Sequence, residues 1–398
     1  MQLQSDVCII GNGAIGKTAA LGLAQAGLSV TLLCPEGIKP SGVMSPEAWD
    51  VRVYALNHDA RALLSSMKVW DALDASRVTP IDAMEVHGDG TDNPGKLAFD
   101  AFGARVGALA WIVEDRNLNQ ALDAALKFAS NVRVVGGVAA AMQVSEKSVA
   151  ITLASGESIT ASLLVGADGG QSWVRSQCGI DISYRPYAQN AIVANFSCEK
   201  PHHGVAFQWF TSAQGILALL PLPGNNVSMV WSAPHALADI LINESPAQLA
   251  QRVSVLALES LGQLQAPTGD IKSFPLSLIR AQAITAPRVA LVGDAAHVIH
   301  PLAGHGMNLG FADVAGLLAT VTQRSAHQDC GDAKVLRRYA RSRKEDILLM
   351  QVATDGLERL FAADFEPLRV ARNIGLNLLD KLPVIKRQLM AHALGKRS

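Results

Sequence analysis

Three glycine-rich segments, far apart in this 398-residue chain, contain residue patterns that suit binding of phosphate and sugar groups. The first is a Gly-x-Gly-x-x-Gly turn made by Gly11, Gly13 and Gly16. Its glycines allow a tight turn and a close approach of the backbone to a pyrophosphate, which then faces a helix N-terminus. Because an apolar run precedes this turn and a helical pattern follows it, the segment predicts a dinucleotide site.

The second and third segments each place a carboxylate directly after an apolar run. Asp168 lies in the sequence Gly-Ala-Asp-Gly-Gly, and a simple Asp-Gly β-turn would be the preferred interpretation if this segment stood alone. Asp294 is the second residue of the longer segment 293–310, whose glycines allow a loop to lie flat against a planar ring. A helix begins in this segment, and its free N–H groups would stabilise an anionic ring by about 0.3–2 kcal/mol.

Two further groups of side chains are less decisive. The acid that normally binds the adenosine ribose is replaced by Cys34; Glu36 could bind the ribose instead, but a solvated loop carboxylate is an equally good interpretation. His297, His300 and His305 fit no regular helical face and have no acidic or cysteine partner motif, so we expect no metal site. No nucleophile–base or paired-carboxylate pattern is present, so we expect no catalytic side chain.

The segments must be positioned by strands and helices that the pattern also predicts. Strands at 6–10 and 29–34 flank a helix at 17–26, and this βαβ unit requires a parallel sheet. Strands at 162–166 and 289–292 lead into the two aspartate segments. Short runs between about 183 and 275, broken by Pro and Gly, indicate an antiparallel sheet with one helix at 246–261.

The predicted fold is therefore α/β: a Rossmann-like nucleotide-binding domain interleaved with an antiparallel-sheet domain, plus C-terminal helices. The first domain is expected to comprise residues 1–75, 100–180 and 280–330, the second 76–99 and 181–279, and the helical region 331–398. The formal net charge of −1 argues against a nucleic-acid partner. Five scattered cysteines, no signal-peptide pattern and no apolar run of roughly 18–20 residues predict a cytoplasmic protein with reduced thiols.

Taken together, the three segments resemble the motifs of class A FAD-dependent aromatic monooxygenases, relatives of para-hydroxybenzoate hydroxylase. Asp50-Val51-Arg52, the segment 293–310 and residues 365–395 narrow the resemblance to the ubiquinone-biosynthesis ring hydroxylases. The resemblance runs from residue 6 to about 395. It implies that O2 and a flavin C4a-hydroperoxide hydroxylate a polyprenylated phenol, so that FAD supplies the chemistry.

The resemblance also assigns positions around the cofactor. Gly11, Gly13, Gly16 and Arg52 would hold the diphosphate and adenosine, Asp168 and Asp294 the ribityl and pyrophosphate region, and Pro301, Gly304, Gly306, Met307 and Asn308 the isoalloxazine. The chain departs from the family at Cys34, at His305 where glutamine is common, and at Asp115-Arg116. The expected walls of the substrate pocket, each equally well interpreted as an ordinary core residue, are Phe207, Trp209, Leu217, Leu219, Pro221 and His305.

The remaining expectations concern partners. Residues 366–398 carry seven basic and two acidic residues beside an apolar stripe, which suits contact with the inner membrane, although a packing helix with a solvated basic face is slightly favoured. The electron donor would be NAD(P)H or a ferredoxin with its reductase, and protein partners would be ubiquinone-biosynthesis proteins or a second copy. Two alternatives stay open: a hydroxylase of a small soluble phenol, and a non-catalytic flavoprotein of a biosynthetic complex.

Overall fold

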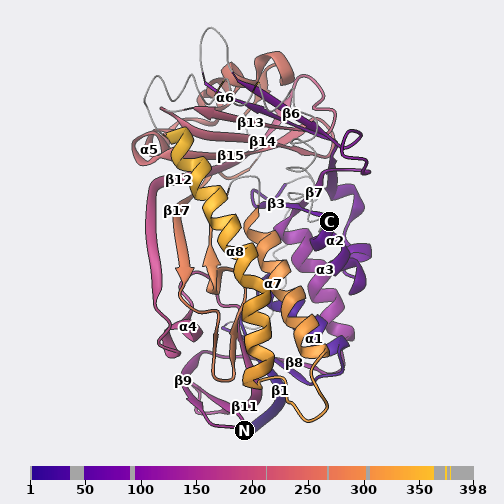
Figure 1. Ribbon diagram of the computed structural model, residues 1–398. Helices are drawn as coiled ribbons and strands as arrows, with labels where there is room; N and C mark the ends of the chain where they lie inside the picture. The colour runs from indigo at the N-terminus through magenta and orange to yellow at the C-terminus, as the bar shows by residue number, and fades with distance from the viewer. Residues whose placement is uncertain are drawn as a thin grey trace.

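The computed structural model describes residues 2–35, 49–89, 95–211, 213–266, 269–301 and 305–362, together with Asn373 and Asn377. The molecule is elongated, with one large sheet near the N-terminus, a second at the opposite end, and helices between and beside them (Figure 1). Among the described residues, no helix has both the length and the apolar composition that crossing a membrane requires.

The first sheet has eight strands; its main path is β18-β19-β11-β1-β2-β8, in which β19 to β8 form a parallel core and β18 is antiparallel to β19. β1 pairs in parallel with both β11 and β2, β11 with β19, and β2 with β8. β9 and β10 extend it with antiparallel pairs. The strands are β1 (Gln2–Ile10), β2 (Val30–Cys34), β8 (Val132–Gly136), β9 (Ala139–Val144), β10 (Val149–Leu153), β11 (Ser158–Gly166), β18 (Thr285–Ala286) and β19 (Val289–Leu291).

Helices cover this sheet and enclose its core. α1 packs against α3 and α7, and α8 lies against α7 and runs towards the second sheet (Figure 1). Fully buried side chains such as Leu23, Leu118 and Val314 join the helices to the strand residues Val7 and Leu32 in one cluster. The helices of this half are α1 (Ala14–Gln25), α2 (His58–Ser66), α3 (Asp115–Phe128), α4 (Trp173–Gln177), α7 (His305–Thr322), α8 (Ala333–Ala362), and the 3-10 turns η1 (Trp70–Ala72), η2 (Ala75–Arg77) and η3 (Gly293–Ala295).

The second sheet has nine strands in the order β20-β17-β12-β15-β14-β13-β5-β6, with β16 beside β12. Its pairs are antiparallel except β13 with β5. α5 (His235–Asn243) and α6 (Pro246–Leu261) bury the cluster around Trp231 on one face of this sheet. The strands are β5 (Ala83–His87), β6 (Lys96–Asp100), β12 (Ile182–Cys198), β13 (Val205–Thr211), β14 (Gly215–Leu222), β15 (Asn226–Pro234), β16 (Leu264–Gln265), β17 (Lys272–Ala281) and β20 (His297–Val298).

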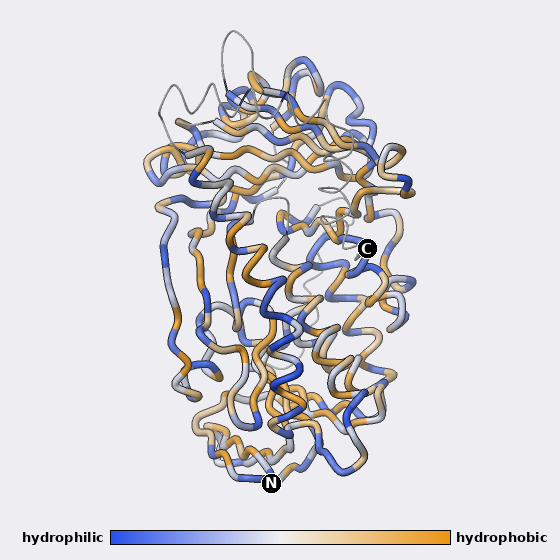
Figure 2. The backbone as a smooth tube through the Cα atoms, viewed as in Figure 1, coloured by the Kyte–Doolittle hydropathy of each residue, from blue (hydrophilic) through white to orange (hydrophobic). Residues whose placement is uncertain are grey.

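A small sheet connects the two halves. It consists of β3 (Val53–Leu56), β7 (Ala110–Glu114) and β4 (Val78–Ile81). Its residues Ala55, Ile81 and Ile112 pack against Ala206 and Leu222 of the nine-stranded sheet. Apolar residues recur along the strands of both large sheets (Figure 2). The predicted fold class is confirmed: a parallel-core sheet, an antiparallel sheet and C-terminal helical structure. The domain boundaries stay a prediction.

Candidate functional site

The three sequence motifs meet at one edge of the parallel-core sheet. β1, β11 and β19 are neighbours, and the pairing aligns Ile10 with Gly166 and Gly166 with Leu291. The chain therefore leaves all three strands at the same level, directly before the glycine turn, the Asp168 loop and the Asp294 loop. Ligands of open α/β sheets bind outside these carboxyl ends. The topology thus brings together motifs that are more than 100 residues apart.

The glycine turn is packed closely on one side and open on the other. Gly11 has φ +118°, and a Cβ added there would lie 2.1 Å from the Ala167 carbonyl oxygen. A Cβ on Gly16 would lie 2.0 Å from the Gly11 oxygen, whereas one on Gly13 would meet nothing within 4 Å. Gly13 is the N-cap of α1, which has no capping side-chain bond and no acid in its first turn. Uncapped N–H groups facing open space fit the diphosphate of a dinucleotide.

Asp168 holds the shape of its own loop. Its carboxylate accepts hydrogen bonds from Ser172 Oγ at 2.5 Å and from the Val174 N–H at 3.0 Å. The buried Arg175 then donates to the Gly170 carbonyl at 2.7 Å and to the Ala295 carbonyl at 2.9 Å. These bonds join the Asp168 loop to the Asp294 loop, so the two aspartate segments form one surface.

Asp294 lies at the surface, close to His297 and Arg52. Its side chain is exposed to solvent, yet burial among protein atoms raises the pKa of its carboxyl, while nearby His297 and Arg52 lower it in part. The guanidinium of Arg52 lies 5.3 Å from the ring centre of Phe274 on β17. Arg52 therefore lies where the two halves of the molecule meet, close to Asp294.

Behind the Asp294 loop lies a buried ionic cluster that sequence patterns did not reveal. Asp313 on α7 is fully buried and accepts from the Gly293 N–H at 3.0 Å, from His297 Nε2 at 2.6 Å and from Arg343 Nε at 2.9 Å. Burial alone would raise the pKa of Asp313, but His297 and Arg343 outweigh that effect and lower it. The only sequence signal was an acid in the middle of an otherwise apolar helix. This cluster fixes the loop that carries Asp294.

The predicted isoalloxazine contacts come from the loop and helix that follow. Pro301, Gly306 and Met307 are half-buried. Asn308 is buried; its amide donates to the Ala55 carbonyl at 2.8 Å and its oxygen accepts from the Asn57 N–H at 3.0 Å. Asn308 therefore fixes the start of α7 against β3. Some predicted positions lie outside the described residues: Glu36, Gly304, the side chain of His305, and residues 366–398 apart from Asn373 and Asn377.

Cys34, which stands where the family has a ribose-binding acid, is inaccessible to solvent. Cys34 is fully buried at the end of β2, and burial raises the pKa of its thiol, with a smaller lowering by Lys17 and a smaller raising by Asp123. Lys17 is itself buried and lies 2.6 Å from Asp123 Oδ1 and 3.1 Å from Asn119 Oδ1. A neutral thiol beside a charge pair thus replaces a free carboxylate at this end of the site.

The histidines of the 293–310 segment have protein partners. His297 pairs with Asp313, and His300 Nε2 lies 3.2 Å from Gln189 Oε1 on β12. Burial lowers the pKa of His300 to about 4, so its imidazole is neutral, and its ring packs edge-on against Tyr187 at 5.0 Å. Within the described parts of the chain, no group of three or more His, Cys, Asp or Glu side chains is arranged to hold a metal.

Five of the six predicted pocket residues lie on the face of the nine-stranded sheet that α5 and α6 cover. Phe207, Trp209, Leu217 and Leu219 are buried in the cluster beneath these helices, and the buried Pro221 follows at the same alternation. The opposite face packs on the small connecting sheet through residues such as Ala206 and Leu222. For these four cluster members, the structure favours the ordinary-core interpretation.

The chain is similar to known proteins both in sequence and in fold. The family model described as "FAD binding domain" matches residues 4–347. The 3-demethoxyubiquinol 3-hydroxylase of Escherichia coli (strain K12) is 35% identical over 98% of both chains, and the ubiquinone hydroxylase UbiL of Rhodospirillum rubrum is 34% identical over 98% of this chain and 90% of its own. The solved structure of Pseudomonas aeruginosa PqsL in complex with 2-aminobenzoylacetate superposes with a TM-score of 0.77 at 20% identity, covering 94% of this chain and 99% of that one. The chain belongs to the family of FAD-dependent monooxygenases that includes the ubiquinone-biosynthesis hydroxylases.

Proposed function

We propose that this FAD-dependent monooxygenase hydroxylates the aromatic ring of a polyprenylated phenol on the route to ubiquinone. The observation that carries the proposal is the convergence of three motifs at the carboxyl edge of β1, β11 and β19, on the side where the small sheet joins the nine-stranded sheet. Two relatives that match nearly the whole chain are named for hydroxylation in this pathway, which supports the same substrate class.

The residues around this edge would hold FAD mainly through backbone groups. The open N-terminus of α1 at Gly13 suits the diphosphate, and the accessible carboxylate of Asp294 suits hydroxyls of the ribityl chain. Because both oxygens of Asp168 already accept hydrogen bonds, we assign it the task of shaping the loop. Bound FAD would supply the O2 chemistry that places one oxygen atom on an electron-rich ring and releases the other as water, with the electron donor providing the two electrons.

The start of α7 supplies the electrostatics. α7 has no acid in its first turn, so its N–H groups present positive potential at Gly306 and Met307. Asn308 fixes this helix end to β3, and Asp313 fixes the preceding loop from behind. The chain therefore provides a fixed field for negative charge on the cofactor, with no side chain required to transfer a proton.

The substrate ring would contact the face of the nine-stranded sheet opposite to α5 and α6. Strand alternation places Asn195, Gln208 and Ser228 on that face, since their neighbours on either side belong to the helix-covered cluster. All three side chains are buried, and the register sets Asn195 directly opposite Ser228. Neither Asn195 Oδ1 nor Ser228 Oγ has a hydrogen-bond partner among the described residues. Polar atoms in such a position suit the oxygen substituents of a phenol.

A complementation experiment tests the proposal. The gene is expressed in bacterial strains that each lack one ring hydroxylase of ubiquinone synthesis, and ubiquinone is quantified by chromatography. We expect ubiquinone to return in one or more strains, and an Asp294→Ala variant to restore none. If no strain recovers ubiquinone while the purified yellow protein oxidises a small soluble phenol, the polyprenylated substrate is refuted and the soluble-phenol alternative is adopted.

A further inference from the structure

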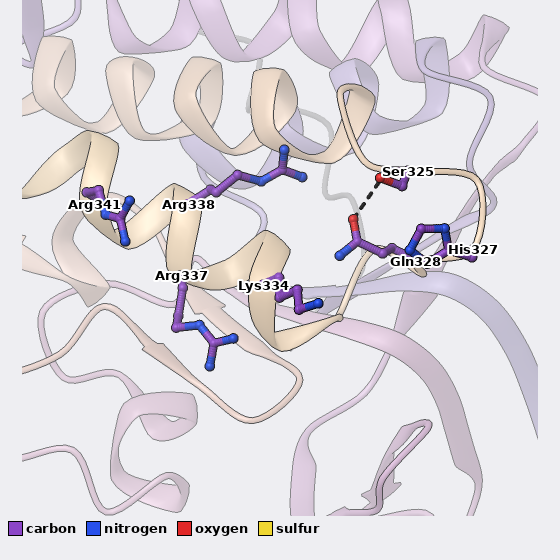
Figure 3. Close-up of a pocket in the computed structure, with 7 residues that line it drawn as sticks. All are labelled: Ser325, His327, Gln328, Lys334, Arg337, Arg338 and Arg341. Atoms are coloured by element: carbon purple, nitrogen blue, oxygen red, sulfur yellow. Dashed lines mark hydrogen bonds between the residues drawn. The ribbon is translucent and has the colours of Figure 1, made fainter.

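A basic groove lies at the far end of α7 from the FAD site. It encloses about 430 Å3 and is lined by the loop residues Ser325, His327 and Gln328 and by Lys334, Arg337, Arg338 and Arg341 of α8. Lys334 and Arg338 extend towards the loop, while Arg337 and Arg341 project from the same helix beside them (Figure 3). The loop residues of the groove follow the C-terminal end of α7, whereas the Asp294 loop precedes the start of this helix.

The four basic side chains of the groove are exposed and have no carboxylate within 4 Å in the part of the chain that the structure describes. Other arginines nearby are paired: Arg288 with Asp329, and Arg343 with Asp313. Asp332, at the start of α8, is engaged in the helix cap, where it accepts from the Lys334 N–H at 2.7 Å and from Gln328 Nε2 at 3.3 Å. The molecule therefore neutralises its neighbouring cations but not those of the groove.

This arrangement opposes helix stability. The positions 334, 337, 338 and 341 follow the i, i+3, i+4, i+7 spacing, so their charges share one face and repel one another. Lys334 also lies in the first turn of α8, where the helix dipole is positive and a cation is unfavourable. An anion in the groove would relieve both effects at once.

We propose that the groove binds a phosphate-bearing anion. Three of its four cations are arginines, whose planar guanidinium groups match phosphate oxygens in pairs, and the Ser325 and His327 side chains add hydrogen-bonding groups to the facing wall. The same chemistry is offered by a free phosphate compound and by a phospholipid headgroup. None of the residues that line the groove belongs to the segments around the FAD site, so the groove is a second binding site that can be tested apart from the hydroxylation proposed above.

The test uses the FAD-loaded full chain and two probes. Binding of inorganic pyrophosphate is measured by titration calorimetry, and binding of vesicles with and without phosphatidylglycerol in phosphatidylcholine is measured by co-sedimentation. The variant carries Lys334→Gln, Arg337→Gln, Arg338→Gln and Arg341→Gln. Its matched control removes four exposed positive charges elsewhere, through Lys127→Gln, Arg133→Gln, Lys147→Gln and Lys272→Gln.

We expect the wild type and the control to bind at least one probe within two-fold of each other, and the groove variant to bind it at least ten-fold more weakly. Binding of pyrophosphate identifies a free phosphate ligand, and binding of phosphatidylglycerol vesicles alone identifies a lipid headgroup. If the variant with four substitutions does not fold, the double variant Arg337→Gln with Arg338→Gln replaces it. The proposal is overturned if neither probe binds or if the control loses as much affinity as the variant. The variant should keep its FAD and its hydroxylase activity, so this result is independent of the complementation experiment.

Discussion

Replacing Gly13 by alanine separates cofactor binding from fold stability. Gly13 has φ −71° and ψ 175°, which alanine adopts without strain, and an added Cβ would meet no atom within 4 Å. Alanine is a poorer N-cap than glycine by roughly 0.3–1.5 kcal/mol. It also stabilises by about 0.4–1 kcal/mol, because it restricts the unfolded chain. We therefore expect the unfolding free energy of the FAD-free Gly13→Ala protein to stay within about 1 kcal/mol of the wild type.

FAD binding should respond very differently. The added methyl group would occupy the space in front of the uncapped N–H groups of α1, where we place the diphosphate. We expect the dissociation constant for FAD to rise at least ten-fold, which is about 1.4 kcal/mol. Gly11→Ala is the contrasting variant, because its Cβ would lie 2.1 Å from a backbone oxygen at φ +118°. Overpacking and backbone strain would each cost about 1–3 kcal/mol there, so this protein should lose stability as well as FAD.

Two measurements decide the matter. Urea unfolding of the FAD-free proteins gives the stability differences, and quenching of flavin fluorescence during titration gives the dissociation constants. The reasoning is refuted if Gly13→Ala binds FAD as tightly as the wild type, since the diphosphate then does not lie at this turn. It is equally refuted if Gly13→Ala is destabilised as strongly as Gly11→Ala, since the open space would then be needed by the fold itself.

Three further variants test other parts of the site. Asp313→Asn should lower the unfolding free energy by about 3–5 kcal/mol at pH 7, because it leaves the buried partners of Asp313 unpaired. The pKa of Asp313 is lowered in the folded protein, so this difference in stability should be complete above about pH 3.9 and shrink as the pH falls below it. Urea unfolding measured across this pH range checks both expectations. Asp294→Ala should purify without yellow colour, and a fully yellow protein would contradict its assignment. Cys34→Glu should destabilise the fold, because it buries a carboxylate near Asp123. Adding Asp123→Asn should recover about 0.5–3 kcal/mol, since Lys17 then becomes free to pair with the new carboxylate. If the destabilisation of the double variant equals the sum of the two single variants, this coupling is contradicted.

The parts of the fold that the sequence predicted are those governed by short-range patterns. The strand before Gly11, the helix after it and the strands before Asp168 and Asp294 all follow from apolar runs that end at glycine. The predicted helix at 246–261 coincides with α6, because its apolar residues recur at helical spacing within the segment itself. Local composition is enough to predict a helix or strand when the apolar pattern lies within the residues of that element.

Long-range features could not be predicted in this way. The cluster of His297, Asp313 and Arg343 joins residues 16 and 30 positions apart, which no local pattern reports. Alternation correctly places Phe207 and Trp209 on one face of β13, but it does not say which face the helices cover. That choice depends on where α5 and α6 return to the sheet, and it determines which residues remain for the substrate.

The departures of this chain from its family fall on side chains, whereas the FAD site that we propose uses largely backbone groups. In the site that we propose, Gly11 and Gly16 would act through the absence of a Cβ, and the starts of α1 and α7 through free N–H groups. Such contacts do not depend on the side chain at Cys34. The Asp313 cluster and the Arg175 bonds then hold these backbone segments in place from behind. We therefore expect substitutions that add a Cβ or break this support to remove FAD more effectively than removal of any polar contact at the adenosine end.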